Sequence, residues 1–245
     1  MSVSEKGRDL LREIRTSLIE LEANGVDRVP RAAAPARKTP GFRPAVAPLD
    51  SSRIPLGGAS ERALAAVAKE LGDCTRCRLH EGRRTIVFGE GSPEAPVVFV
   101  GEGPGEQEDR SGRPFVGRAG ELLTKMIEAV GWTREDVYIC NIVKCRPPKN
   151  RDPQLDEVAA CSPFLEQQIR AISPRAIVTL GKPAAQKMLG RPVAITRARG
   201  TWEEWHGIPL MPTYHPAYLL RNYTRETRQA VWDDLRAVRA RVDGA

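Results

Sequence analysis

The sequence predicts a three-layer α/β/α protein, in which helices cover both faces of a central, mainly parallel sheet of four strands. Short apolar runs typical of buried strands alternate along the chain with longer segments whose apolar residues recur at helical spacing. Alternation of this kind indicates parallel strands joined by helical crossovers. With 245 residues, 41% of them hydrophobic, the chain is long enough for one such domain and an appendage.

The appendage is predicted at the N-terminus, over residues 1–59. Residues 5–24 have leucine and isoleucine at helical spacing with charges between them, which indicates a short amphipathic helix. Residues 28–58 are rich in proline, alanine and arginine, and such a segment buries too little surface to offset its ordering entropy. We therefore expect a flexible linker there, either a passive tether or a segment that touches a nucleic-acid backbone.

The domain itself is predicted over residues 60–245, and it begins with an alanine-rich helix at Ser60. After this helix, strands and helices alternate to the end of the chain. The predicted strands are 96–101, 137–143, 176–181 and 208–215, and the predicted helices are 119–132, 155–172, 183–189 and 225–242.

The formal net charge of +7 and the pI of about 9.4 indicate a polyanionic partner, nucleic acid first. No apolar run approaches the roughly 18 residues of a membrane span, and the charged N-terminus lacks the apolar core of a secretory signal. We expect a cytoplasmic monomer that does not bind a membrane and whose thiols are reduced.

Polar residues lie at the ends of three predicted strands. Glycines 101 and 103 flank Glu102 at the end of the first strand, Asn141 lies near the end of the second, and His215 ends the last. Ligands of parallel sheets bind beyond the carboxyl ends of the strands. We therefore expect these groups to converge on one crevice.

The first of these turns, "VVFVGEGPGEQED" at 97–109, resembles a phosphate-binding turn but departs from it. Gly101 and Gly103 match the dinucleotide fingerprint, whereas Glu106 stands where the third glycine is needed. The acidic residues that follow suit a helix N-terminus and would repel a pyrophosphate. A nucleotide-dependent oxidoreductase is thus disfavoured, and the glycines would instead let the backbone approach a flat neutral ligand closely.

The chain has five cysteines. Cys74 and Cys77 form "CTRC", Cys145 and Cys161 follow further on with 15 residues between them, and Cys140 has apolar neighbours in a predicted strand. Four thiolates can hold zinc or an iron–sulfur cluster, and the spacing leaves both metals open, as well as a set of buried free cysteines.

Four motifs, "GEGPGEQED", "GRPFVGRAG", "CNIVKCRPPKNRDP" and "HPAYLLRN", occur in this order together with the four cysteines. They closely resemble the family-4 uracil-DNA glycosylases, which are DNA-repair enzymes of the uracil-DNA glycosylase superfamily. The resemblance covers about residues 60–242. It implies hydrolysis of the N-glycosidic bond of deoxyuridine in DNA, which releases uracil and leaves an abasic site for base excision repair.

The resemblance also implies the roles of individual residues. A structural [4Fe–4S] cluster close to DNA-binding elements would be held by Cys74, Cys77, Cys145 and Cys161. Uracil would lie against the turn and stack on an aromatic ring, with an amide at its N3–H and O4 and a histidine at its O2. The implied uracil-binding residues are Glu102, Gly103, Pro104, Gly105, Phe115, Asn141 and His215.

The water-positioning group is left open by the sequence. A better-known branch of the superfamily has an aspartate at the position of Gly103, so that Glu102, Glu106 or backbone carbonyls must hold the water here. His215 is expected to contribute more, by stabilising the leaving uracil.

Contacts to DNA phosphates are expected from Arg146, Lys149, Arg151 and Arg221. Leu219 or Leu220 would fill the gap left by the flipped base, unless both are ordinary helix-packing residues.

Other functions remain as alternatives. Relatives that trap uracil-DNA covalently use a histidine in an insertion after the third cysteine, and residues 146–160 contain neither histidine nor an obvious insertion. A non-catalytic iron–sulfur DNA-binding module is disfavoured by the intact set of uracil-pocket residues. The sequence does not distinguish single- from double-stranded DNA or uracil from other damaged bases. The N-terminal extension could recruit a repair or replication partner.

Overall fold

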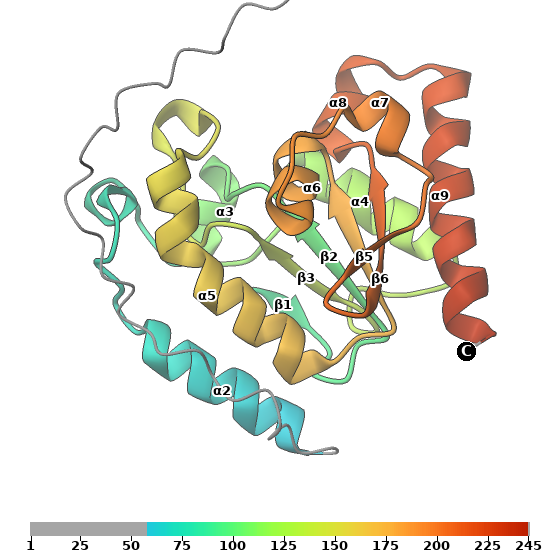
Figure 1. Cartoon of the computed structure of the whole chain (residues 1–245). Coiled ribbons are helices and arrows are strands. Elements are labelled where there is room, and N and C mark those ends of the chain that lie inside the picture. Colours follow the sequence, from blue (N-terminus) through green and yellow to red (C-terminus); the bar gives the residue numbers. More distant parts are fainter. Residues whose placement is uncertain (1–57, 245) are drawn as a thin grey trace, which may run out of the picture. The chain divides into compact units, whose positions relative to one another are not determined.

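A six-stranded sheet forms the centre of the computed structural model, which describes residues 58–244 (Figure 1). The strand order is β1-β3-β2-β4-β6-β5, and the four strands in the middle are parallel to one another. These four are the predicted strands. The strands are β1 (Glu90–Gly91), β2 (Val97–Gly101), β3 (Tyr138–Asn141), β4 (Ala176–Leu180), β5 (Glu203–Trp205) and β6 (Ile208–Thr213). The sequence did not predict β1 and β5, two short antiparallel edge strands.

Helices cover both faces of this sheet. Figure 1 shows α2 and α5 on one side and α4 and α9 on the other. The α-helices are α2 (Ala59–Leu71), α3 (Glu106–Ser111), α4 (Arg118–Ala129), α5 (Leu155–Ile172), α6 (Lys182–Leu189), α7 (Ile195–Ala198), α8 (Pro216–Arg221) and α9 (Arg225–Asp243). Two short 3-10 helices, η1 (Arg78–Glu81) and η2 (Pro148–Asn150), lie in the connections.

Two apolar cores lie between these layers, one on each face of the sheet. Along β2, Val98 and Val100 belong to the core under α2 and α5, whereas Val97 and Phe99 belong to the core under α4 and α9. A strand covered on both faces needs apolar residues at every position, which explains the continuous run "VVFV". The predicted three-layer α/β architecture is confirmed.

The chain order of the strands locates the binding crevice. After β2 the chain continues to β3, which pairs with one edge of β2. It then returns through α5 to β4, which pairs with the other edge of β2. The loops that leave β2 and β4 therefore separate at the carboxyl edge of the sheet, where open α/β sheets bind ligands.

The predicted N-terminal extension lies outside the described residues, apart from its last two, which precede or begin α2. Its predicted helix over 5–24 and nearly all of its linker are thus not described. None of the described helices is both long and apolar enough to cross a membrane.

Candidate active site

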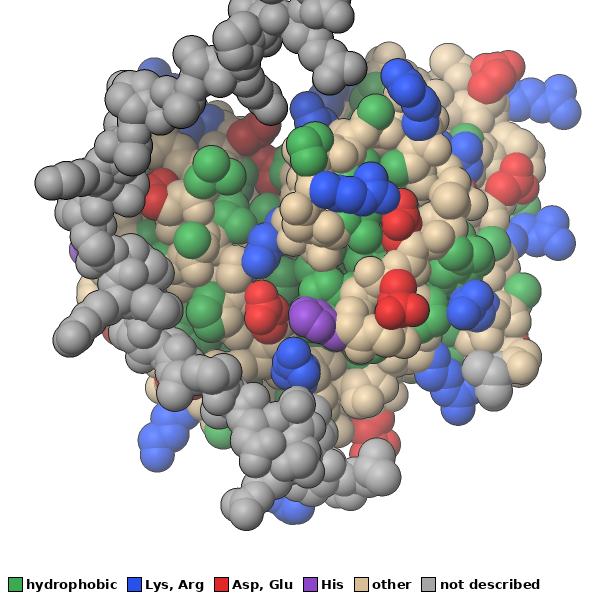
Figure 2. All heavy atoms as spheres, viewed as in Figure 1, with side chains coloured by type: hydrophobic (Ala, Val, Ile, Leu, Met, Phe, Trp, Pro, Cys, Tyr) green, Lys and Arg blue, Asp and Glu red, His purple; other side chains and the backbone are tan. Residues whose placement is uncertain are grey.

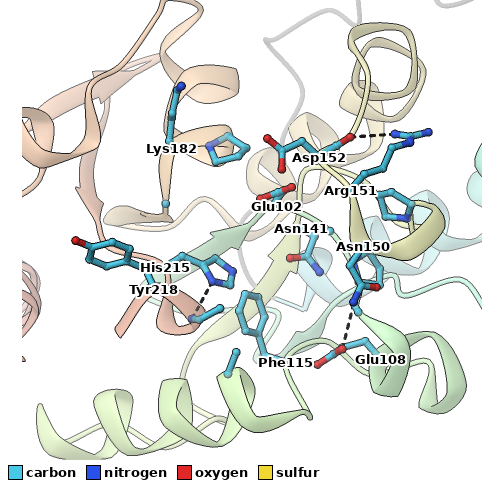
Figure 3. Close-up of a pocket in the computed structure, with 18 of the residues that line it drawn as sticks. Glu102, Glu108, Phe115, Asn141, Asn150, Arg151, Asp152, Lys182, His215 and Tyr218 are labelled. Carbon is cyan, nitrogen blue, oxygen red and sulfur yellow. Dashed lines mark hydrogen bonds between the residues drawn. The ribbon is translucent and has the colours of Figure 1, made fainter. Parts of the chain in front are cut away.

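A pocket of about 610 Å³ opens at the carboxyl edge of the sheet (Figure 3). Each parallel strand contributes to its lining, through Glu102–Gly105 after β2, Asn141 in β3, Gly181 after β4 and His215 after β6. Phe115, from the loop between α3 and α4, completes the wall. The structure therefore brings together all seven residues that the resemblance assigns to uracil.

Gly101, the last residue of β2, lies against two residues of the pocket wall and leaves no room for a side chain. It pairs in register with Asn141 across β2 and β3. A Cβ atom at Gly101 would lie 2.4 Å from Asn141 Oδ1 and 2.5 Å from the ring of Phe115. Glycine is required here because the amide and the ring both approach the backbone closely.

Asn141 has a buried hydrogen-bond acceptor that the rest of the described chain leaves unpaired. The residue is 1% exposed, and its Oδ1 has no hydrogen-bond partner among the described residues. Leaving such an atom unpaired costs about 1–3 kcal/mol. Because Asn141 lines the pocket, an N–H group of a ligand is the natural partner.

Phe115 has a backbone conformation that few residues other than glycine adopt. Its φ of +52° lies in the left-handed region, where residues other than glycine are strained. The guanidinium of Arg134 holds this loop in place. It donates hydrogen bonds to the backbone carbonyl oxygens of Pro114 at 2.8 Å and Phe115 at 3.1 Å. The Phe115 ring lies 5.7 Å from the ring of His215, so the two rings flank one space.

Glu108, in α3, ties the same loop to the turn after β2. One carboxylate oxygen accepts hydrogen bonds from the backbone amides of Val116 and Gly117, each at 2.9 Å. The other accepts from the amide of Gly105 at 3.1 Å. A single carboxylate therefore joins two walls of the pocket.

His215 is held in one tautomer. Its Nδ1 accepts a hydrogen bond from the backbone amide of Ala217 at 3.1 Å (Figure 3). Burial, and then the positive charge of Arg221, lower the pKa of His215 to about 4. The imidazole is therefore neutral at pH 7, and its proton is on Nε2.

Glu102 has a partner that the sequence did not predict. Its carboxyl group lies next to that of Asp152, and both residues line the pocket (Figure 3). Burial and the charge of Asp152 raise the pKa of Glu102 to about 7. Glu106, the other expected water-positioning residue, is not part of the pocket lining; its carboxylate pairs instead with Arg110 and, at 3.6 Å, with Arg146.

The basic residues expected to contact DNA differ in their surroundings. Arg221 lines the pocket and Lys149 is exposed. Arg151 also lines the pocket, but its guanidinium is paired with the buried Glu157 at 2.6 Å. Arg146 is hydrogen-bonded to Asn150 at 2.8 Å in addition to its pairing with Glu106.

Basic side chains elsewhere do not form a separate stripe on the face in Figure 2, where acidic side chains lie between them. Lys182, which the sequence analysis did not single out, lines the pocket at the start of α6.

The two leucines expected to fill the gap left by the flipped base differ clearly in their exposure. Leu219 is 2% exposed and packs in the core under α4 and α9, whereas Leu220 is 38% exposed.

Comparison with known proteins agrees with this geometry. A family model described as the uracil DNA glycosylase superfamily matches residues 88–236. The chain belongs to this superfamily.

Relatives place the chain more narrowly within the uracil-DNA glycosylase superfamily. The type-4 uracil-DNA glycosylase of Thermotoga maritima is 50% identical over 177 residues, which cover 71% of this chain and 92% of the relative. The type-4 enzymes of Saccharolobus solfataricus and Sulfurisphaera tokodaii are 45% and 46% identical, and their matches cover 71% and 72% of this chain and 83% of each relative. The resemblance to the type-4 branch is thus confirmed.

The four cysteines that the sequence resemblance assigns to a cluster pack against one apolar core. Cys74 and Cys77 follow α2, Cys145 follows β3, and Cys161 lies in α5. All are free thiols, and Cys140 is a fifth, fully buried in β3.

Three of these sulfurs each accept a hydrogen bond from one nitrogen donor. Arg76 donates to Cys74 Sγ at 3.4 Å and Arg83 to Cys145 Sγ at 3.5 Å. The backbone amide of Lys144 donates to Cys161 Sγ at 3.3 Å. Within residues 58–244, no group of three or more His, Cys, Asp or Glu side chains is arranged to hold a metal ion.

Proposed function

We propose that the protein is a uracil-DNA glycosylase of base excision repair, which hydrolyses the N-glycosidic bond of deoxyuridine in DNA. The products are free uracil and an abasic site. The observation that carries this proposal is the pocket itself, in which an unpaired amide oxygen, an aromatic ring and a neutral imidazole surround one space. The sequence identity of 45–50% to type-4 uracil-DNA glycosylases supports the same activity.

Asn141 accounts for the choice of base. Its free Oδ1 accepts from the N3–H of uracil, and its amide N–H donates to O4. Cytosine presents an acceptor at N3 and a donor at N4, so its binding would leave buried polar groups mispaired. Extruding the base costs about a few kcal/mol, and stacking on Phe115 returns about 1–3 kcal/mol.

His215 accounts for departure of the base. As the glycosidic bond breaks, its electron pair moves onto uracil, and negative charge spreads to O2. The Nε2–H of His215 donates to that oxygen and stabilises the charge, and the imidazole stays neutral because its pKa is about 4. Water then attacks the cationic sugar carbon, and its proton passes to the carboxylate of Glu102, which lines the pocket.

Phosphates of the DNA would be contacted by Lys149, Lys182 and Arg221, whose charged groups take part in no ion pair within the described part of the chain. Arg146 and Arg151 would add to this surface only by exchanging their present partners. Leu220 would enter the gap left by the base, because its side chain is the exposed one of the leucine pair.

A [4Fe–4S] cluster held by Cys74, Cys77, Cys145 and Cys161 is part of the proposal. The donors fit such a group, since four free thiols share one apolar region and hydrogen-bond donors reach three of the sulfurs. A four-iron cluster takes one thiolate at each iron, so its ligands need not converge on a point as they do around zinc. When bound, the cluster would cross-link the segments that carry these cysteines.

The remaining expectations concern the whole chain. We propose a glycosylase domain over residues 60–245 and a separate N-terminal extension over 1–59 that is available to a repair or replication partner. The protein would act in the cytoplasm as a monomer.

The decisive experiment is a uracil-excision assay on end-labelled oligonucleotides that differ only in carrying uracil, thymine or cytosine at one position. Alkali-sensitive cleavage of the uracil strand alone is the expected result. Inactivity of the wild-type protein on single- and double-stranded uracil-DNA would refute the proposal. A heat-stable band of low mobility on a denaturing gel would instead indicate covalent trapping.

A further inference from the structure

Asp152 lies beside Glu102 in the pocket, and the steps above give it no task. Glu102 directly follows the last residue of β2, and Asp152 lies in the loop between η2 and α5 (Figure 3). Both side chains line the same cavity, and Figure 3 shows their carboxyl groups next to each other. Two residues 50 positions apart in the sequence are thus brought together at the reaction space.

Two neighbouring carboxylates repel each other, and a proton on one of them relieves this repulsion. Glu102 therefore holds its proton more strongly than an isolated glutamate does. Burial and the neighbouring Asp152 raise the pKa of Glu102 to about 7, whereas an isolated glutamate titrates near 4.5.

Other charged or titratable groups around the pocket do not replace this partner. Glu108 is occupied by three backbone amides, Arg151 is paired with Glu157, and His215 is neutral. The remaining charged groups that line the pocket are Lys182 from α6 and Arg221 from α8, and the phenols are Tyr214 and Tyr218.

We propose that Asp152 is a positioning residue that makes Glu102 a base suited to neutral pH. As the water oxygen bonds to the sugar carbon, a water proton moves to Glu102, and the new O–H of Glu102 donates to the Asp152 carboxylate. The glycosidic electron pair leaves with uracil, so charge and atoms balance without another reactant. This inference rests on the proposed glycosylase activity and adds a residue to it.

The test is the pH profile of uracil excision under single-turnover conditions, for the full chain with its metal content unchanged. The wild-type rate should fall on the acid side with a midpoint near the pKa of Glu102, about 7. Asp152→Asn should move this midpoint down by about one pH unit, because removing a like charge lowers the pKa of its neighbour. The plateau rate should also fall, since Glu102 becomes a weaker base.

Three further variants isolate the effect. Glu102→Gln should remove the acid limb and reduce the rate by about 10²-fold or more. Asp152→Glu, which retains the carboxylate, should return the midpoint toward the wild-type value. Asp156→Asn is the matched control, because Asp156 is an exposed carboxylate at the start of α5 that pairs with Arg78 at 3.0 Å, and its profile should equal that of the wild type.

The outcomes separate the two proposals. A wild-type midpoint in the Asp152→Asn variant, or an acid limb that survives Glu102→Gln, would overturn the role of the pair while leaving glycosylase activity intact. Absence of excision by the wild-type protein at every pH would overturn the proposed function itself. Because Asp152 is exposed, the asparagine variant should fold, and its thermal unfolding midpoint provides the check.

Discussion

Glu108 offers a quantitative test of how the pocket is held together, through replacement by alanine and by glutamine. The carboxylate accepts three backbone hydrogen bonds, from Gly105 on one wall and from Val116 and Gly117 on the other. Alanine removes all three acceptors. Glutamine can direct its oxygen to Val116 and Gly117, but its amide N–H groups then face the N–H of Gly105, so that one bond is lost.

The expected loss of stability follows from the number of hydrogen bonds that each variant loses. A hydrogen bond to a charged group contributes about 1.5–3 kcal/mol to stability. Water can reach part of this half-buried site, so the lower end of that range applies, and Glu108→Ala should lower the free energy of unfolding by about 3–5 kcal/mol. Glu108→Gln should lower it by about 1.5–2 kcal/mol, because it loses one bond of the three.

Urea denaturation followed by circular dichroism measures these differences, and titration with free uracil reports whether the Phe115 loop is still in position. Glu106→Ala is the matched control on the same helix. Glu106 pairs with Arg110 on the surface, so its removal should cost less than about 1 kcal/mol. Equal losses for Glu108→Ala and Glu106→Ala would show that the carboxylate does not join the two walls.

Three more predictions concern the pocket and its rim. Protonation of His215 should destabilise the folded protein as the pH falls from about 6.5 to about 4, because the unfolded chain binds a proton there first; over this range in urea denaturation the wild type should lose about 3 kcal/mol of stability relative to His215→Asn. Gly101→Ala should abolish uracil binding in calorimetry while a folded protein remains, since its Cβ would meet Asn141 Oδ1 at 2.4 Å. Lys182→Ala and Arg221→Ala should each weaken DNA binding and reduce the slope of log K against log salt by about one, which anisotropy titrations at several salt concentrations can measure.

The regular elements could be predicted from the sequence because their apolar periods are strong. The helix predicted over 155–172 is α5 with the same bounds, and the strands differ by a few residues at their ends. The edge strands could not be predicted in the same way. At two and three residues, β1 and β5 are too short to show a period, and they exist because a neighbouring strand supplies hydrogen bonds.

The candidate site was predictable where it depends on strand ends. The parallel sheet alone brings Asn141 and His215 to one edge, whatever the loops do. The same rule could have found Lys182, since it follows the apolar run of β4 with only a glycine between them.

Residues placed by irregular loops were not predictable. Asp152 reaches the pocket through a proline-rich loop that has no period. Of the bonds made by Glu108, the one to Gly105 is a local helix cap, but those to Val116 and Gly117 depend on the path of the following loop. The choice between Leu219 and Leu220 depended on how α8 is rotated against α4 and α9.

The distribution of the four cysteines has a consequence for how the protein is made. Cys74 and Cys77 leave the ribosome well before Cys145 and Cys161, and the later pair depends on β3 and α5 for its position. A nascent chain therefore exposes two thiols long before it can offer four. If the proposed cluster forms, iron delivery would have to wait for β3 and α5, and until then the early "CTRC" segment would expose its two thiols without the later pair.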